Sequence, residues 1–123
     1  MISFESFLPE EGMPIYLQIV RHIKRGIVSG AVVHGDEVPS RRVLSALLGV
    51  NPNTIQKAYA MLEEEGLMAS HAGAKSYMTV SGARAEAVRE ELLRADVTAV
   101  IDALRQMGLS KTEALSLIET YWN

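Results

Sequence analysis

Residues 51–57 bring together side chains that can form paired hydrogen bonds with a flat polar partner. Asparagine and glutamine amides match the donor and acceptor that adenine exposes in the major groove of DNA, and threonine or proline can contact a thymine methyl group. If this segment is helical from Pro52, its apolar residues occupy one face and leave the polar side chains on the others. We therefore expect contacts with A·T base pairs here. The polar side chains are Asn53, Thr54, Gln56 and Lys57.

Positive charge gathers in the same part of an acidic chain. The net charge of the whole sequence is -3, which by itself counts against a nucleic-acid partner. Between residues 21 and 60, however, six basic residues stand against two acidic ones. Arg41 and Arg42 come just before the amide-rich segment, and Lys75 follows it, so the local charge permits contact with phosphates. Three further basic residues are expected to form a solvated helix face: Arg21, Lys24 and Arg25.

No arrangement suited to catalysis or metal binding is visible. The chain has no cysteine, which excludes disulfides and thiolate ligands. Residues 63–65 are consecutive glutamates, which point in different directions on a helix and cannot converge on one metal. There is also no nucleophile with a neighbouring base and no phosphate-binding glycine loop. We expect no enzyme, no metal site and no cofactor, and we expect surface positions for His22, His34 and His71.

The composition is that of an ordinary globular protein, with 48% hydrophobic and 22% charged residues. The first residues lack the basic region and apolar run of a signal peptide. No apolar stretch approaches the roughly 20 residues that a membrane span needs. The sequence therefore predicts a cytoplasmic protein with no membrane partner.

A proline and a glycine mark the two ends of the first predicted helix. Pro14 suits a first helical turn, where its missing N–H costs nothing. Isoleucine recurs at every fourth residue from Ile15 to Ile27, which predicts one apolar face. Ser29 and Gly30 then end the helix.

Two shorter helices follow, joined by a sharp turn. Ser40 is a good N-cap for a helix over residues 41–48, and Gly49 can adopt the left-handed conformation that ends it. Asn51 caps the next helix, which ends at Gly66. This is the helix-turn-helix pattern, although a helical hairpin would show the same periodicity. The inward residues are expected to be Val43, Leu44, Leu47 and Leu48 in the first of these helices and Ile55, Ala58, Tyr59 and Leu62 in the second.

The periodicity changes after the third helix. Residues 33–39, before the helix-turn-helix, are predicted as a loop, whereas residues 67–71 and 76–80 are predicted as strands. Gly73 supplies the turn between these strands. A hairpin directly after a helix-turn-helix is the wing of a winged helix.

The last third of the chain is predicted to be helical. Residues 84–107 form a long helical pattern that ends at Gly108, and apolar residues within it step by four and three, as in packed helices. Residues 110–113 form a capping box for a final helix. We expect this tail to form a dimer interface through Leu93, Val97, Val100, Leu104, Leu115, Ile118, Tyr121 and Trp122.

Together these elements predict a mainly α-helical α+β fold with two parts. Residues 1–81 would form a winged helix-turn-helix DNA-binding domain, and residues 82–123 a two-helix dimerisation region.

Several ordered motifs support this organisation, over residues 14–19, 35–42, 48–59 and 64–68, with the glycine turn at Gly73. In these motifs the sequence resembles the DNA-binding domain of GntR-family transcriptional regulators. Its tail is similar to that of the YtrA subfamily, which has only a short helical dimerisation region. The resemblance implies a homodimer that binds a palindromic DNA operator, often near genes for membrane transporters.

The resemblance also implies roles for single residues. Ser40 would offer its hydroxyl to a phosphate, and Arg42 matches the arginine of the family's Pro-Ser-x-Arg motif. Many family members carry arginine near the positions of Pro52 and Gln56, so this sequence does not predict strong guanine recognition. The wing also departs from the family, which commonly has arginine and then glycine where this chain has Ala74 and Lys75. The candidate DNA contacts are Ser40, Arg41, Arg42, Asn51, Pro52, Asn53, Thr54, Gln56, Lys57 and Lys75.

Two alternatives stay open. A winged helix can also serve as a protein-interaction module, with the tail binding a different protein; a steep salt dependence of DNA affinity would separate this from a DNA-binding repressor. Tyr121 and Trp122 could line a small-molecule pocket instead of a dimer interface. Any effector, whose identity the sequence does not give, would bind at the dimer interface or between tail and wing.

Overall fold

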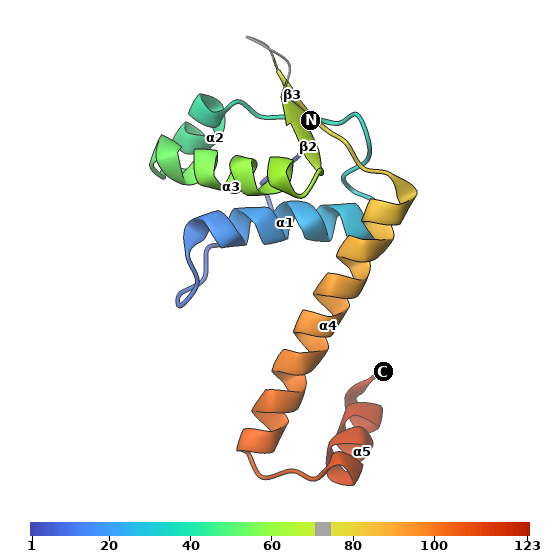
Figure 1. Ribbon diagram of the computed structural model, residues 1–123. Helices are drawn as coiled ribbons and strands as arrows, with labels where there is room; N and C mark the ends of the chain where they lie inside the picture. Colours follow the sequence, from blue (N-terminus) through green and yellow to red (C-terminus); the bar gives the residue numbers. More distant parts are fainter. Residues whose placement is uncertain (71–74) are drawn as a thin grey trace. The chain divides into compact units, whose positions relative to one another are not determined.

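The computed structural model describes residues 1–70 and 75–123. It is mainly helical with one small antiparallel sheet, so the predicted fold class is confirmed (Figure 1). The chain divides into two compact units, Met1–Arg89 and Glu90–Asn123. No helix among the described residues is long and apolar enough to cross a membrane. In chain order the elements are α1 (Ile15–Ser29), β1 (Glu37–Val38), α2 (Arg41–Leu48), α3 (Pro52–Glu64), β2 (Met68–Ser70), β3 (Ser76–Met78), α4 (Gly82–Gln106) and α5 (Lys111–Tyr121).

Helix α1 carries the core of the first unit. It runs from Ile15 to Ser29, and Gly30 ends it with a φ of 86°, as predicted. Pro14 is the N-cap, one residue before the first helical turn in which it was predicted. Ile19 and Ile23 are fully buried, and α1 packs against α3. The prediction that Lys24 lies on a solvated face was wrong, because Lys24 follows Val20 by four residues and so lies on the buried stripe.

Helices α2 and α3 form the predicted helix-turn-helix. The Ser40 Oγ accepts a hydrogen bond from the Val43 backbone N–H at 3.1 Å, and Gly49 ends α2 with a φ of 68°. On α3 the predicted inward residues are all buried: Ile55, Ala58, Tyr59 and Leu62.

The predicted inward face of α2 was largely wrong. Leu44 is fully buried, but Val43 and Leu47 are 55% and 66% exposed. Leu48 is half-buried, and among the described residues α2 packs mainly on α3. The apolar spacing predicts that a helix has a buried face, but it does not predict how many neighbours will cover that face.

The sheet has the strand order β1-β3-β2 and is antiparallel. Strand β3 pairs Tyr77 with Ala69 of β2 on one side and with Glu37 of β1 on the other. The predicted loop over residues 33–39 therefore contains a strand, which is too short for an alternating pattern to reveal. The predicted wing strands are confirmed in shorter form, and the predicted turn at Gly73 lies outside the described residues.

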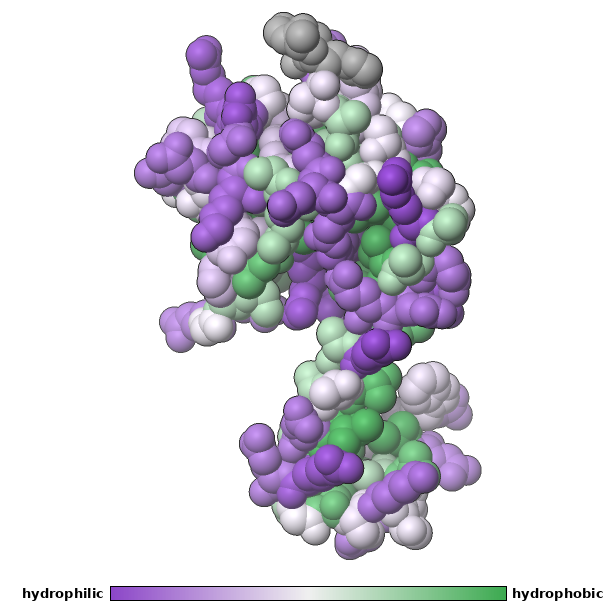
Figure 2. All heavy atoms as spheres, viewed as in Figure 1, coloured by the Kyte–Doolittle hydropathy of each residue, from purple (hydrophilic) through white to green (hydrophobic). Residues whose placement is uncertain are grey.

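The second unit combines the rest of α4 with α5. The predicted capping box is present: the Ser110 Oγ accepts from the Glu113 N–H at 3.2 Å, and the Glu113 carboxylate accepts from the Ser110 N–H at 3.0 Å. These hydrogen bonds lower the pKa of Glu113 below its ordinary value. Figure 2 shows hydrophobic side chains gathered on the visible face of this unit. Its exposed apolar residues include Leu93, Val97, Val100, Leu115, Ile118, Tyr121 and Trp122.

Candidate nucleic-acid interface

The first turn of α3 presents polar side chains to solvent. Asn51 caps the helix, because its Oδ1 accepts a hydrogen bond from the Asn53 backbone N–H at 2.8 Å. Pro52 takes the first helical position, where its missing N–H costs no hydrogen bond. Asn51, Pro52 and Asn53 are exposed, and Thr54 is half-buried. This turn is a polar, solvent-accessible surface that a base edge could meet.

The start of α2 is held by a residue of α3. The Tyr59 hydroxyl donates a hydrogen bond to the Pro39 carbonyl at 2.7 Å, although the rest of this side chain lies in the core. Burial raises the pKa of Tyr59 well above its ordinary value, and the nearby charge of Arg41 opposes this only in part. The contact fixes the residue just before Ser40. The position of the arginines on the first turn of α2 therefore depends on α3.

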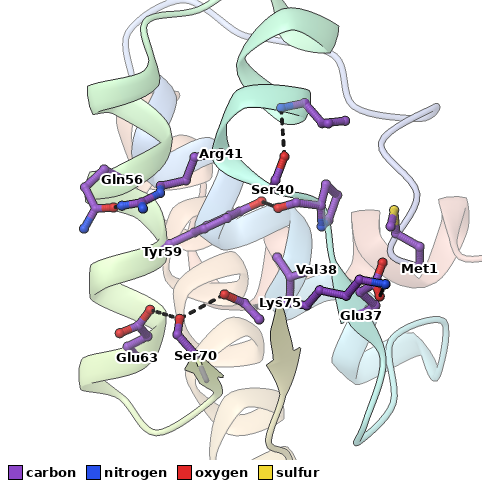
Figure 3. A pocket seen from close by; sticks show the side chains of 13 residues that line it. Met1, Glu37, Val38, Ser40, Arg41, Gln56, Tyr59, Glu63, Ser70 and Lys75 are labelled. Atoms are coloured by element: carbon purple, nitrogen blue, oxygen red, sulfur yellow. Dashed lines mark hydrogen bonds and ion pairs between the residues drawn. The ribbon is translucent and has the colours of Figure 1, made fainter. Parts of the chain in front are cut away.

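Arg41 and Gln56 connect the two helices of the helix-turn-helix. The Arg41 guanidinium donates a hydrogen bond to Gln56 Oε1, and both side chains are exposed (Figure 3). Both residues were predicted as DNA contacts, but the sequence does not predict that they touch each other. Helical spacing describes each helix alone, whereas this contact depends on how α2 packs on α3. Arg42, on the same turn of α2, is also exposed.

A cleft of about 780 Å³ lies between the helix-turn-helix and the sheet. In the close view Gln56, Tyr59 and Glu63 line it from α3, and Glu37 lines it from β1 (Figure 3). Four of the predicted DNA contacts also line this cleft: Ser40, Arg41, Gln56 and Lys75. The structure thus brings together candidate residues from α2, α3 and the wing.

Two carboxylates in this cleft have partners that the sequence did not indicate. Glu37 forms an ion pair with Lys75, with 3.1 Å between Oε1 and Nζ. This pairing raises the pKa of Lys75. Glu63 accepts a hydrogen bond from the Ser70 hydroxyl at 2.9 Å, and Ser70 lies 2.9 Å from the Ser76 hydroxyl. The wing cation that was predicted to contact DNA is therefore paired with an acid in the structure.

Lys57 is held away from this cleft. Its Nζ lies 4.1 Å from the centre of the Tyr16 ring on α1, a cation–π distance. The predicted contacts therefore divide into two groups on α3. Gln56 faces the cleft and Arg41, whereas Lys57 is held beside α1.

Among residues 1–70 and 75–123, no three histidine, aspartate or glutamate side chains are placed to hold a metal ion. Tyr59 was predicted only as a core residue, yet its hydroxyl holds the start of α2. A buried tyrosine usually finds a partner for its hydroxyl, so its polar role was foreseeable, but the Pro39 carbonyl as partner was not.

Comparison with known proteins agrees with this geometry. Residues 15–78 match the family described as bacterial regulatory proteins, gntR family. The chain is 30% identical over 112 residues to the uncharacterized HTH-type transcriptional regulator YhcF of Bacillus subtilis, covering 91% of this chain and 93% of that protein. It is 32% identical over 99 residues to the HTH-type transcriptional repressor YtrA of the same organism, covering 80% of this chain and 72% of that protein.

Solved structures show the same fold. A GntR family transcriptional regulator from Listeria monocytogenes superposes with a TM-score of 0.79 and 32% identity, covering 91% of this chain and 98% of that chain. The DNA-binding domain of AraR, in complex with operator ORX1, superposes with a TM-score of 0.52 and 29% identity over 58% of this chain and 87% of that chain. These matches confirm the predicted resemblance to GntR-type and YtrA-type regulators, which are transcriptional regulators and not enzymes.

Proposed function

Since this chain belongs to the gntR family of bacterial regulatory proteins and is a DNA-binding transcriptional regulator, we propose that it acts as a homodimeric repressor on an inverted-repeat operator. The observation that carries the proposal is the exposed, capped first turn of α3, with the basic first turn of α2 beside it. In this arrangement residues 1–81 bind DNA and residues 82–123 form the dimer.

Each part of the interface has a distinct task. The first turn of α3 enters the major groove, where Asn53 and Thr54 contact base edges. Ser40 and Arg42 contact phosphates from the start of α2, which sets the register of the protein on the duplex. Lys75 brings a further positive charge from the wing. The remaining assigned contacts are Arg41, Asn51, Pro52, Gln56 and Lys57.

The second unit supplies the dimer interface. Tyr121 and Trp122 are 79% and 81% exposed in a single chain, which leaves large apolar surfaces in water. A second copy would cover them, and Leu104 of α4 is half-buried beside the exposed seam. A two-fold axis would place two copies of α3 about 34–36 Å apart, one turn of DNA, or a multiple of that. The operator is therefore an inverted repeat.

The sense of regulation is taken from the relative YtrA of Bacillus subtilis, which is named a transcriptional repressor. A dimer bound across a promoter blocks RNA polymerase by occupying the same DNA. A protein that acts on the chromosome in this way works in the cytoplasm.

Selection from a randomised DNA pool at two salt concentrations tests the proposal. The expected result is an inverted repeat whose affinity falls steeply with salt, because neutralising several phosphates releases counterions. Light scattering at micromolar concentration should give the mass of two chains. Recovery of no motif, with weak binding only at low salt, would instead favour a protein-interaction module, and a monomeric mass would exclude the two-fold arrangement.

A further inference from the structure

The hydrogen bond between Arg41 and Gln56 determines which way the Gln56 amide faces. A guanidinium has five N–H donors and no acceptor, so only the oxygen of an amide can face it. Gln56 Oε1 accepts from Arg41 in the structure. The NH₂ group of Gln56 is therefore turned away from Arg41, towards the exposed surface of α3.

This orientation changes what the glutamine can bind. Adenine recognition by glutamine uses both ends of the amide, because the oxygen accepts from N6 and the nitrogen donates to N7. Here the oxygen is engaged by a charged donor, and such hydrogen bonds are stronger than neutral ones. The oxygen keeps one free lone pair, but most of the groups left at the surface are N–H donors, from Gln56 and from the rest of the guanidinium.

A surface rich in N–H donors matches the major-groove edge of guanine. Guanine exposes two acceptors, N7 and O6, at its major-groove edge, whereas adenine exposes one acceptor and one donor. Resting on the DNA-binding function proposed above, we propose that Arg41 and Gln56 act as one unit that recognises guanine in the operator. Arg41 is then a specificity-determining residue: α2 supplies the guanidinium that α3 itself lacks.

The surroundings keep Arg41 available for this role. The two carboxylates that line the same cleft bond elsewhere, Glu37 to Lys75 and Glu63 to Ser70. The hydrogen bond from Tyr59 to Pro39 holds the start of α2 against α3, which keeps Arg41 within reach of Gln56.

The position of Gln56 favours a base over a phosphate. Gln56 follows Asn53 by three residues, so the two side chains share one face of α3. The helix turn that presents Asn53 to the groove thus presents Gln56 one turn further along. Both side chains are exposed, so DNA can reach them without rearrangement of the core.

The experiment compares operators selected by the wild-type protein and by three variants. The Gln56→Ala variant identifies the base pair that Arg41 and Gln56 contact, because that is the operator position at which the base preference changes. The wild type should select guanine there. Arg41→Ala frees the amide oxygen, so preference at that position should fall for guanine by about 10-fold and rise for adenine. Arg42→Ala is the matched control: it should weaken binding to all sequences and keep the guanine.

A second measurement tests directly whether N7 of this guanine accepts a hydrogen bond from the protein. Replacing that guanine with 7-deazaguanine removes N7, which should weaken wild-type binding by about 10-fold and have little effect on Arg41→Ala. Adenine in the wild-type motif, or an Arg41→Ala variant that weakens all sequences equally as Arg42→Ala does, would overturn the inference and assign Arg41 to a phosphate. A wild-type protein that selects no motif would overturn the DNA-binding proposal itself, which is a distinguishable result.

Discussion

The ammonium group of Lys24 on α1 lies 2.8 Å from the carboxylate of Glu65, just beyond the last turn of α3. The Lys24 side chain is only 7% exposed, whereas that of Glu65 is 36% exposed. The pair therefore joins the two helices that form the core of the DNA-binding unit. It also sits where α3 turns into the wing.

Loss of the Glu65 carboxylate should destabilise the protein because it removes the charge that faces a buried ammonium. We expect Glu65→Gln to lower the free energy of unfolding by about 1 kcal/mol, since the exposure of Glu65 screens part of the interaction. Lys24→Met should cost less, because an apolar side chain can fill the same stripe. Urea unfolding measures both. Glu64→Gln, at an exposed neighbouring position, is the control, and equal effects of the two glutamate variants would contradict the role of the pair.

Local features of this fold could be predicted from the sequence. Ser40, Asn51 and Ser110 each cap a helix through an atom only two or three residues away. Gly30 and Gly49 end their helices in the left-handed conformation. All these interactions lie within a few residues of chain, so the order of residue types is enough to predict them.

Features that depend on packing could not be predicted in the same way. The hydrogen bond between Arg41 and Gln56 spans 15 positions, and the ion pair of Lys24 spans 41. Strand β1 exists only because β3 lies beside it. These contacts depend on how two elements meet in space, and the periodicity of each element contains no information on that.

Gly26 lies inside α1, where alanine would ordinarily stabilise a helix by about 1 kcal/mol. A Cβ at this position would clash with Val32 Cγ2, and Val32 is buried. We therefore expect Gly26→Ala to destabilise the protein by about 1–3 kcal/mol through overpacking. Thermal or urea unfolding measures it. In a Val32→Ala background the same change should become neutral or stabilising; destabilisation of equal size in both backgrounds would refute the steric explanation.

The raised pKa of Tyr59 predicts a dependence of stability on pH. The folded state holds the hydroxyl neutral, whereas the unfolded chain ionises near its ordinary value of 10.0. The contribution to stability is therefore fully present below pH 10 and is lost as the pH rises above it. Tyr59→Phe should make the unfolding free energy less sensitive to pH in this range. It should also cost about 1 kcal/mol at neutral pH through loss of the hydrogen bond to Pro39. Tyr77→Phe, a change at a half-buried tyrosine of β3, is the control variant.

The ion pair between Glu37 and Lys75 predicts opposite effects of its two members on DNA binding. Lys75→Ala removes a positive charge from the wing and should reduce the salt slope of binding by about 1, with equal weakening across sequences. Glu37→Gln removes an acid that pairs with this cation, and it should strengthen binding at low salt. Fluorescence anisotropy with the selected operator measures both. Weaker binding after Glu37→Gln would show that the acid positions Lys75 and does not compete with DNA for it.

Trp122 is the only tryptophan of the chain, and it reports directly on the proposed dimer. It is 81% exposed in a single chain, so a monomer should emit as a tryptophan in water, and a dimer that buries it should emit at shorter wavelength. Dilution should therefore shift the emission to longer wavelength. Val97→Asp places a charge on the exposed apolar seam of α4, and it should give the monomer mass in light scattering and the water-like emission at all concentrations. Gln106→Asp, an exposed polar position near the end of the same helix, should leave the dimer intact. If Val97→Asp stays dimeric, the interface lies elsewhere, and the two-fold geometry of the operator must be derived from another surface.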